Sequence, residues 1–152
     1  MFNEEAKAIR RVTSGVNLKR ELYAARLAQD KNVYRAANVK ALAAADRWGG
    51  GKGDPIGVIE GGIEAVRNAT GLRPNLMTMG ASVMSLLKFH PAIQAAIGAN
   101  ERKRITIEIL KDLFQLEDVA IGEPVSMASM KDAQNKDKVP PDIWGDNLML
   151  HY

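Results

Sequence analysis

Residues 54–80, DPIGVIEGGIEAVRNATGLRPNLMTMG, decide the fold, because they carry a helix start, a helix stop and a strand in one run. Asp54 is a favourable N-cap, and Pro55 fits the first helical position, where its missing N–H costs nothing. Gly71 supplies a left-handed residue to end the helix, and Pro74 prevents its continuation. Between these signals, apolar residues at helical spacing predict a buried stripe: Ile56, Ile59, Ile63 and Val66.

The segments that follow are expected to be short strands and short helices. Leu76–Met79 is too apolar to be exposed on both faces and is expected to be a strand, after which Ser82 is a candidate N-cap. Pro91 disfavours the helical conformation at His90, so two short helices are expected there. The remaining expected elements are a helix capped by Thr106 and ending near Phe114, a strand at 119–121, an extended segment at 125–130, a long loop at 131–142 and a strand at 148–152. This order predicts an α+β fold.

The first third of the chain is expected to contain a basic helix. Thr13-Ser14-Gly15 is expected to break any helix before it, and Asn17 is a plausible N-cap for its resumption. Leu18, Leu22 and Ala25 then share one face. Residues 33–48 leave two alternatives open, since the alanine run at 41–45 favours a helix while the valine and aromatic residues favour an extended chain.

Composition limits the class of protein. The chain has 152 residues, enough for one domain with its own core, and 46% of them are hydrophobic. It has no cysteine, which excludes disulfides and thiolate metal sites. No apolar run approaches the ~20 residues that a membrane span requires. The N-terminal residues are charged and carry no apolar signal segment. A soluble, intracellular protein without a membrane partner is therefore expected.

The charge is unevenly distributed along the chain. Residues 1–52 hold 11 Lys and Arg against 5 Asp and Glu, whereas residues 53–152 hold 10 against 13. The basic segment is compatible with a small nucleic-acid-binding module, although a solvated helix surface is the more common meaning of such a pattern. The candidates for intersubunit or DNA-facing contacts are Arg20, Arg26, Arg102, Lys103 and Arg104. Because the run at 102–104 lacks interleaved aromatic residues, surface or intersubunit pairing is favoured over nucleic-acid contact.

No catalytic constellation is evident, and no cofactor or metal site is predicted. The glycine-rich run 49–53 lacks the spacing of a phosphate-binding loop, and Asp54 would repel phosphate, so a flexible linker is favoured. The two histidines, His90 and His151, have no nearby groups in the sequence to orient them. A structural or solvent-exposed histidine at the helix joint is favoured over a catalytic one.

The order of motifs resembles one known family, the major capsid proteins of tailed bacteriophages and prophages, whose fold is shared with encapsulin shells. The resemblance covers roughly residues 48–152 and rests on the order of these segments: 54–56 opening a helix, 69–75 before a strand, His90-Pro91 between helices, 107–114, 119–123 and 143–148. The resemblance implies an axial-domain-like core, with helices packed on a small mixed sheet, preceded by a long spine-like helix. It also implies a non-enzymatic protein without a cofactor.

The resemblance further implies a domain division and a role. Residues 1–48 would belong to the peripheral domain, residues 49–53 would be a linker, and residues 54–152 would form the axial-domain-like body. The resemblance implies a subunit that assembles into pentamers and hexamers of an icosahedral shell. This shell would form in the bacterial host cytoplasm and enclose DNA, which the subunits would contact without sequence specificity. The chain would then be a virion protein whose main partner is itself. Compared with the family, it has short ends, which suggests a fragment or truncated member.

Overall fold

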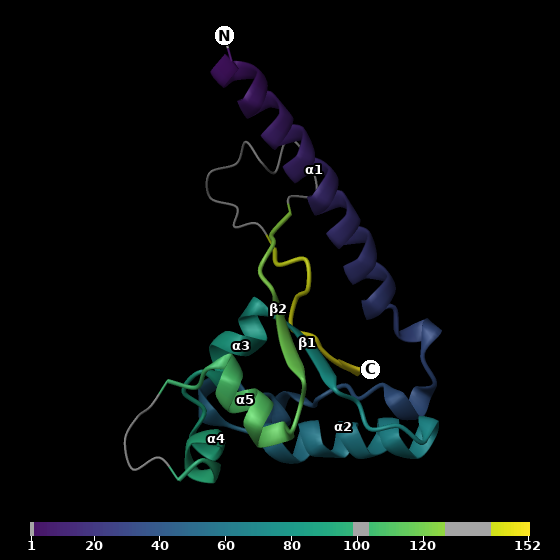
Figure 1. The fold of residues 1–152 in the computed structure, drawn as a ribbon. Helices are drawn as coiled ribbons and strands as arrows, with labels where there is room; N and C mark the ends of the chain where they lie inside the picture. Colours follow the sequence, from purple (N-terminus) through teal and green to yellow (C-terminus); the bar gives the residue numbers. More distant parts are fainter. Residues whose placement is uncertain (1, 99–103, 127–140) are drawn as a thin grey trace.

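The computed structural model describes residues 2–98, 104–126 and 141–152. In chain order the elements are α1 (Phe2–Gln29), the 3₁₀ turns η1 (Lys31–Val33), η2 (Ala36–Asn38), η3 (Ala44–Asp46) and η4 (Gly49–Gly51), then α2 (Pro55–Thr70), β1 (Leu76–Gly80), α3 (Ala81–Leu87), α4 (Pro91–Ala96), α5 (Ile107–Phe114), β2 (Asp118–Gly122) and β3 (Leu148–His151). Helices and a small sheet form a body from which α1 extends (Figure 1). The predicted α+β class is confirmed.

The described strands form one mixed sheet in the order β2-β1-β3. β1 lies in the centre, parallel to β2 and antiparallel to β3. Met77 and Met79 of β1 are buried, as is Val119 of β2. Side chains alternate between the two faces of a strand, so these residues place one face of β1 in the core. The predicted strands at 76–79, 119–121 and 148–152 agree with the observed ones to within a residue or two.

Helix α2 begins and ends where the sequence predicts. The Asp54 carboxylate accepts a hydrogen bond from the Gly57 N–H at 2.9 Å, and Gly71 ends the helix with a φ of 77°. Ile59 and Ile63 are buried against the core, while Ile56 and Val66 are only half-buried. The predicted stripe therefore does face the core, but only its two central residues are fully buried.

The helices after β1 follow the prediction with one correction. α3 and α4 are separate helices divided at His90-Pro91, as expected. Ser82 is not the N-cap of α3, because the helix begins at Ala81 and its N-cap is Gly80, two residues before the predicted one. The Ser82 hydroxyl instead lies 3.0 Å from the Gly145 carbonyl oxygen and 2.8 Å from an Asp146 carboxylate oxygen. The hydroxyl therefore joins α3 to the turn that precedes β3.

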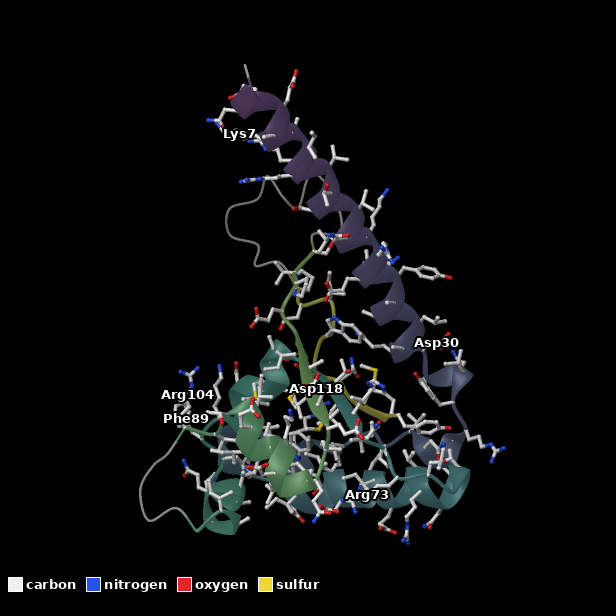
Figure 2. All side chains as sticks on the ribbon, viewed as in Figure 1. Lys7, Asp30, Arg73, Phe89, Arg104 and Asp118 are labelled. Atoms are coloured by element: carbon white, nitrogen blue, oxygen red, sulfur yellow. The ribbon has the colours of Figure 1, made fainter. Side chains whose placement is uncertain are left out.

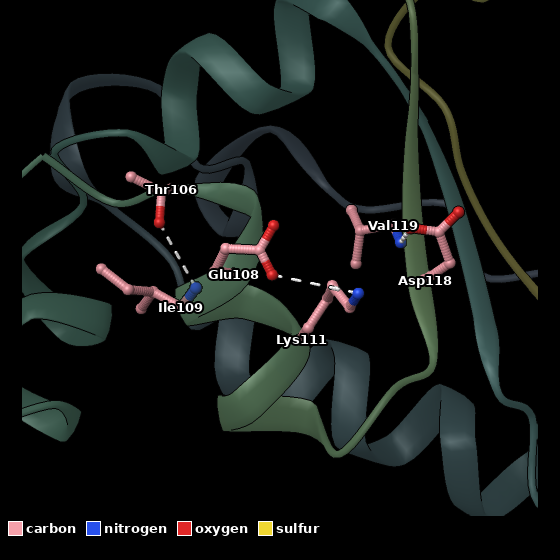
Figure 3. A network of polar contacts seen from close by, with 6 residues as sticks. All are labelled: Thr106, Glu108, Ile109, Lys111, Asp118 and Val119. Carbon is pink, nitrogen blue, oxygen red and sulfur yellow. Dashed lines mark hydrogen bonds and ion pairs between the residues drawn. The ribbon is translucent and has the colours of Figure 1, made fainter.

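Helix α5 is fixed at its start by the predicted cap. Thr106 accepts a hydrogen bond from the Ile109 N–H at 3.4 Å, and Glu108 lies 3.9 Å from the Lys111 ammonium one turn later (Figure 3). Leu110 and Phe114 are fully buried. The Arg73 guanidinium donates to the Phe114 carbonyl at 3.1 Å, which ties the end of α5 to the segment before β1.

The N-terminal prediction requires a larger correction. Thr13-Ser14-Gly15 does not interrupt the helix, and Asn17 is an interior residue of the 28-residue α1. One glycine in a helix interior costs only about 1 kcal/mol relative to alanine. The helical segments on both sides of Gly15 can therefore stay continuous. Residues 33–48 form short 3₁₀ turns joined by extended backbone, neither a long helix nor a strand. Val125 bridges Asp142, and most of the predicted extended segment and loop at 125–142 lies outside the described residues.

Candidate intersubunit surfaces

Helix α1 contacts the body through one face near its C-terminal end. Of the three residues predicted for that face, Ala25 is fully buried and Leu22 is half-buried, whereas Leu18 is exposed. Two residues of the same region make hydrogen bonds across the interface. The Glu21 carboxylate accepts from the Trp144 indole N–H at 2.9 Å, and the Gln29 amide donates to the Ile143 carbonyl at 3.0 Å. We call Glu21, Gln29, Trp144 and Asn147 the α1 anchor.

The anchor is completed by close packing around Trp144 and Asn147. The Asn147 amide donates to the Gln29 side-chain oxygen at 3.2 Å and to the Trp144 carbonyl at 3.2 Å. The Trp144 indole lies directly on Gly122 of β2, where a Cβ would overlap Cδ1 of the ring. The position of α1 therefore depends on a turn at 143–147 and on the absence of a side chain in β2.

The opposite face of α1 carries an exposed apolar stripe that the sequence analysis missed. Its residues recur at helical spacing about half a turn away from Ala25. Ile9, Val12 and Tyr23 are 65%, 67% and 73% exposed. We call this the outer stripe, and its five members are Ile9, Val12, Val16, Tyr23 and Leu27. The expected helix break at 13–15 concealed the pattern, because it divided the stripe between two supposed segments.

The basic residues predicted for contacts do not converge on one site. Arg20 and Arg26 are exposed on α1. Arg104 is exposed beside Phe89, on the side of the body away from α1 (Figure 2). None of these three forms an ion pair within the part of the chain that the structure describes. Arg102 and Lys103 lie outside the described residues.

His90 has a structural position. It is 1% exposed and serves as the N-cap of α4. Its Nδ1 accepts from the Ala92 N–H at 3.3 Å, so Nε2 carries the proton and donates to the Lys52 carbonyl at 2.9 Å. Both ring nitrogens are thus used to join α4 to the glycine-rich turn, which agrees with the predicted helix-joint role. His151 lies elsewhere, 3.0 Å from the Thr78 hydroxyl.

A groove of about 620 Å³ opens on the body beside β3. Its lining comes from four segments: residues 37–48, α2, α3 and the run from Asp146 to Leu150. Much of the α2 lining is small or aliphatic, including Val58, Ala65 and Val66. Trp48 also lines the groove, and its buried indole N–H has no hydrogen-bond partner among the described residues. Sequence reasoning could not locate this groove, because its walls are distant from one another in the chain.

Two classes of site receive no support from the described residues. Within ranges 2–98, 104–126 and 141–152, no group of three metal-ligating side chains comes together. No helix in that part of the chain is both long enough and apolar enough to cross a membrane. The surfaces that remain are the outer stripe, the exposed arginines and the groove.

Comparison with known structures shows that the fold is similar to part of a phage-related protein. A phage-related protein from Bordetella bronchiseptica RB50 matches all of this chain with a TM-score of 0.81 and 24% sequence identity. The match covers 47% of that protein. The chain therefore has the fold of part of a phage-related protein.

Sequence comparison names the relatives. The major capsid protein of Burkholderia phage BcepMu is 38% identical over 99% of this chain, and that of Pseudomonas phage JBD67 is 27% identical over 99%. No protein-family model matches the chain. The chain spans about half the length, 47%, of each of these relatives. The resemblance predicted from the order of motifs is confirmed: the chain is homologous to phage major capsid proteins.

Proposed function

We propose that this chain is a structural subunit of a phage head, which associates with copies of itself to form the capsid. The observation that carries the proposal is 38% identity to a major capsid protein over nearly the whole chain. The outer stripe adds independent support. Five apolar side chains on one exposed helix face are costly to leave in water and are typical of a surface that another chain covers. The role is structural and non-enzymatic, and the protein is a component of the virion.

The finer proposal concerns the assembly itself. Subunits would gather into pentamers and hexamers of an icosahedral shell, assembled in the bacterial host cytoplasm around DNA. In this arrangement residues 1–48 form the peripheral part, 49–53 the linker and 54–152 the axial body. Arg20, Arg26, Arg102, Lys103 and Arg104 are proposed to face neighbouring subunits or DNA. Helix α1 has six basic and three acidic residues, which suits contact with phosphate that does not depend on base sequence.

Light scattering coupled to size-exclusion chromatography, with negative-stain imaging of the early fractions, tests this proposal. Rings or closed particles are expected. Val16→Glu places a charge in the outer stripe and should reduce the particle fraction, because a buried unpaired carboxylate is strongly unfavourable. Asn17→Glu adds the same charge to an exposed position outside the stripe and is the matched control. A chain that stays monomeric at all concentrations argues against self-assembly of this chain, and equal behaviour of the two variants argues against the stripe.

DNA contact is tested separately, by filter binding at two salt concentrations. Binding should weaken steeply as salt rises, because each neutralised phosphate releases counterions. Arg20→Glu with Arg26→Glu should remove most of the binding, whereas loss of Glu64, which pairs with Arg67 on α2, should not. Absence of binding at low salt would overturn the proposed DNA contact and leave the capsid role untouched.

A further inference from the structure

The outer stripe of α1 has the spacing of a contact line between two paired helices. Three of its residues recur every seven positions: Ile9, Val16 and Tyr23. Val12 follows Ile9 by three residues, and at about 100° per residue all four fall within an arc of about 60°. Such spacing is typical of the seam of a helix pair. These side chains are 52% to 73% exposed, so the residues that the structure describes leave the seam open to a partner.

The charged residues beside the stripe are separated by sign along the helix. In the N-terminal half, the charge next to the stripe is that of Glu5, about one turn before Ile9. In the C-terminal half, the stripe is flanked by three cations: Lys19, Arg20 and Arg26. The basic residues of the N-terminal half point more than about 90° away from the stripe: Lys7, Arg10 and Arg11. The stripe therefore runs from an acidic end to a basic end.

This distribution makes the stripe complementary to a second copy of itself in one direction. Two antiparallel α1 helices bring Glu5 of each copy to the basic end of the other, whereas parallel helices would align the cations with one another. Opposite charges beside an apolar seam favour pairing, and like charges oppose it. When Val16 lies on the two-fold axis, Ile9 of one copy faces Tyr23 of the other. Glu5 then lies beside Arg26 of the other copy.

The position of the body leaves room for this pair. The body holds α1 through Ala25 and Glu21, on the face away from the stripe, so each body would lie on the outer side of the pair. From the body, α1 extends toward its free N-terminus (Figure 1). In an antiparallel pair the two bodies therefore stand at opposite ends of the paired helices, whereas in a parallel pair they would share one end.

We infer that the outer stripe of α1 pairs antiparallel with the outer stripe of a second copy, across a two-fold axis near Val16. The inference rests on the proposed self-association, whose contact surface and direction it specifies. A two-fold contact uses the same surface on both subunits and closes after two copies, whereas a ring of five or six requires contacts between different surfaces. The α1 pair would therefore connect a subunit of one ring to a subunit of the next.

Disulfide crosslinking tests the direction of pairing, because the chain has no cysteine of its own. Val16→Cys should give a crosslinked dimer on mild oxidation, and an equimolar mixture of Ile9→Cys and Tyr23→Cys chains should give the mixed dimer. Neither of these last two variants should crosslink alone. Identical positions seven residues from the axis are about 21 Å apart, and a disulfide needs Cα atoms within about 7 Å. Ser14→Cys, exposed on the opposite face of α1, is the control that should stay uncrosslinked.

The possible results separate this inference from the capsid role. Crosslinking of Ile9→Cys or Tyr23→Cys alone would show parallel pairing and overturn the inference. A mixed dimer no more abundant than that of Ser14→Cys would also overturn it. Particles that form without these crosslinks would refute the helix pair and leave the capsid role intact. Crosslinked dimers that form without particles would support the pair and argue against shell formation by this chain alone.

A charge reversal provides a second measurement. Glu5→Lys should raise the dissociation constant of the dimer by about threefold or more in sedimentation equilibrium, because like charges would then meet at both ends of the pair. Glu4→Lys makes the same charge change about 100° around the helix, on the face where Glu4 pairs with Lys7, and should have the smaller effect. Equal weakening by the two variants would show a response to net charge and contradict the antiparallel arrangement.

Discussion

Replacing Gly122 by alanine should disconnect α1 from the body. The added Cβ would overlap the Trp144 indole, which lies on Gly122 and cannot shift like the end of a flexible side chain. Trp144 would have to leave its site. The hydrogen bond to Glu21 would then be lost, and leaving a buried polar group without its partner costs about 1–3 kcal/mol. Lost packing of a half-buried aromatic ring adds to this, at less than the roughly 3–5 kcal/mol of a full Trp→Ala truncation in a core.

We therefore expect Gly122→Ala to lower the free energy of unfolding by about 2–4 kcal/mol. Urea denaturation followed by circular dichroism measures this value, and limited proteolysis reports whether α1 is released. Gly61→Ala is the matched control, since a Cβ there meets nothing within 4 Å and alanine should stabilise α2 by about 1 kcal/mol. The same substitution should thus have opposite signs at the two positions. An unfolding midpoint for Gly122→Ala at or above that of the unmodified protein would refute the role assigned to the anchor.

Other substitutions test single features of the body by the same unfolding measurement. Gly62→Ala should stabilise less than Gly61→Ala, because its Cβ meets Leu150 Cδ1 at 2.8 Å and that side chain must move; a larger gain at Gly62 would contradict this. His90→Ala should cost about 1–3 kcal/mol, since the Lys52 carbonyl and the Ala92 N–H lose their ring-nitrogen partners, and a neutral result would mean that water replaces the ring nitrogens. Asp54→Ala should cost about 1 kcal/mol through loss of the α2 cap, while Asp54→Asn should cost less; equal losses would count against capping.

Local sequence signals predicted best those elements whose ends are marked by a capping residue, a proline or a terminal glycine. Helix α2 has a capping carboxylate, a proline at its first position and a glycine with positive φ at its end, and all three act as expected. The division at His90-Pro91 was equally predictable, because proline restricts the residue before it. The cap at Thr106 belongs to the same group.

The failures have physical causes of two kinds. Gly15 was given too much weight, although the cost of one glycine is small compared with the interactions of a 28-residue helix. Ser82 was given the role of a cap, yet its hydroxyl is used by the turn at Gly145 and Asp146, a tertiary contact that the sequence does not reveal. The groove and the anchor are of this second kind, because each joins residues more than a hundred positions apart or from several segments. The predicted arginine contacts remain predictions.

The attachment of α1 has a mechanical consequence. Among the residues that the structure describes, buried side chains and hydrogen bonds hold α1 to the body from Glu21 to Gln29, so the preceding helical residues form a lever about 28 Å long. A rotation of about 10° at the anchor would displace the free end by about 5 Å, which is close to the rise of three helical residues. A small adjustment at Trp144 is therefore magnified at Ile9 and Val12. In a self-associating subunit, the angle at which two neighbours meet would be controlled from the other end of this helix.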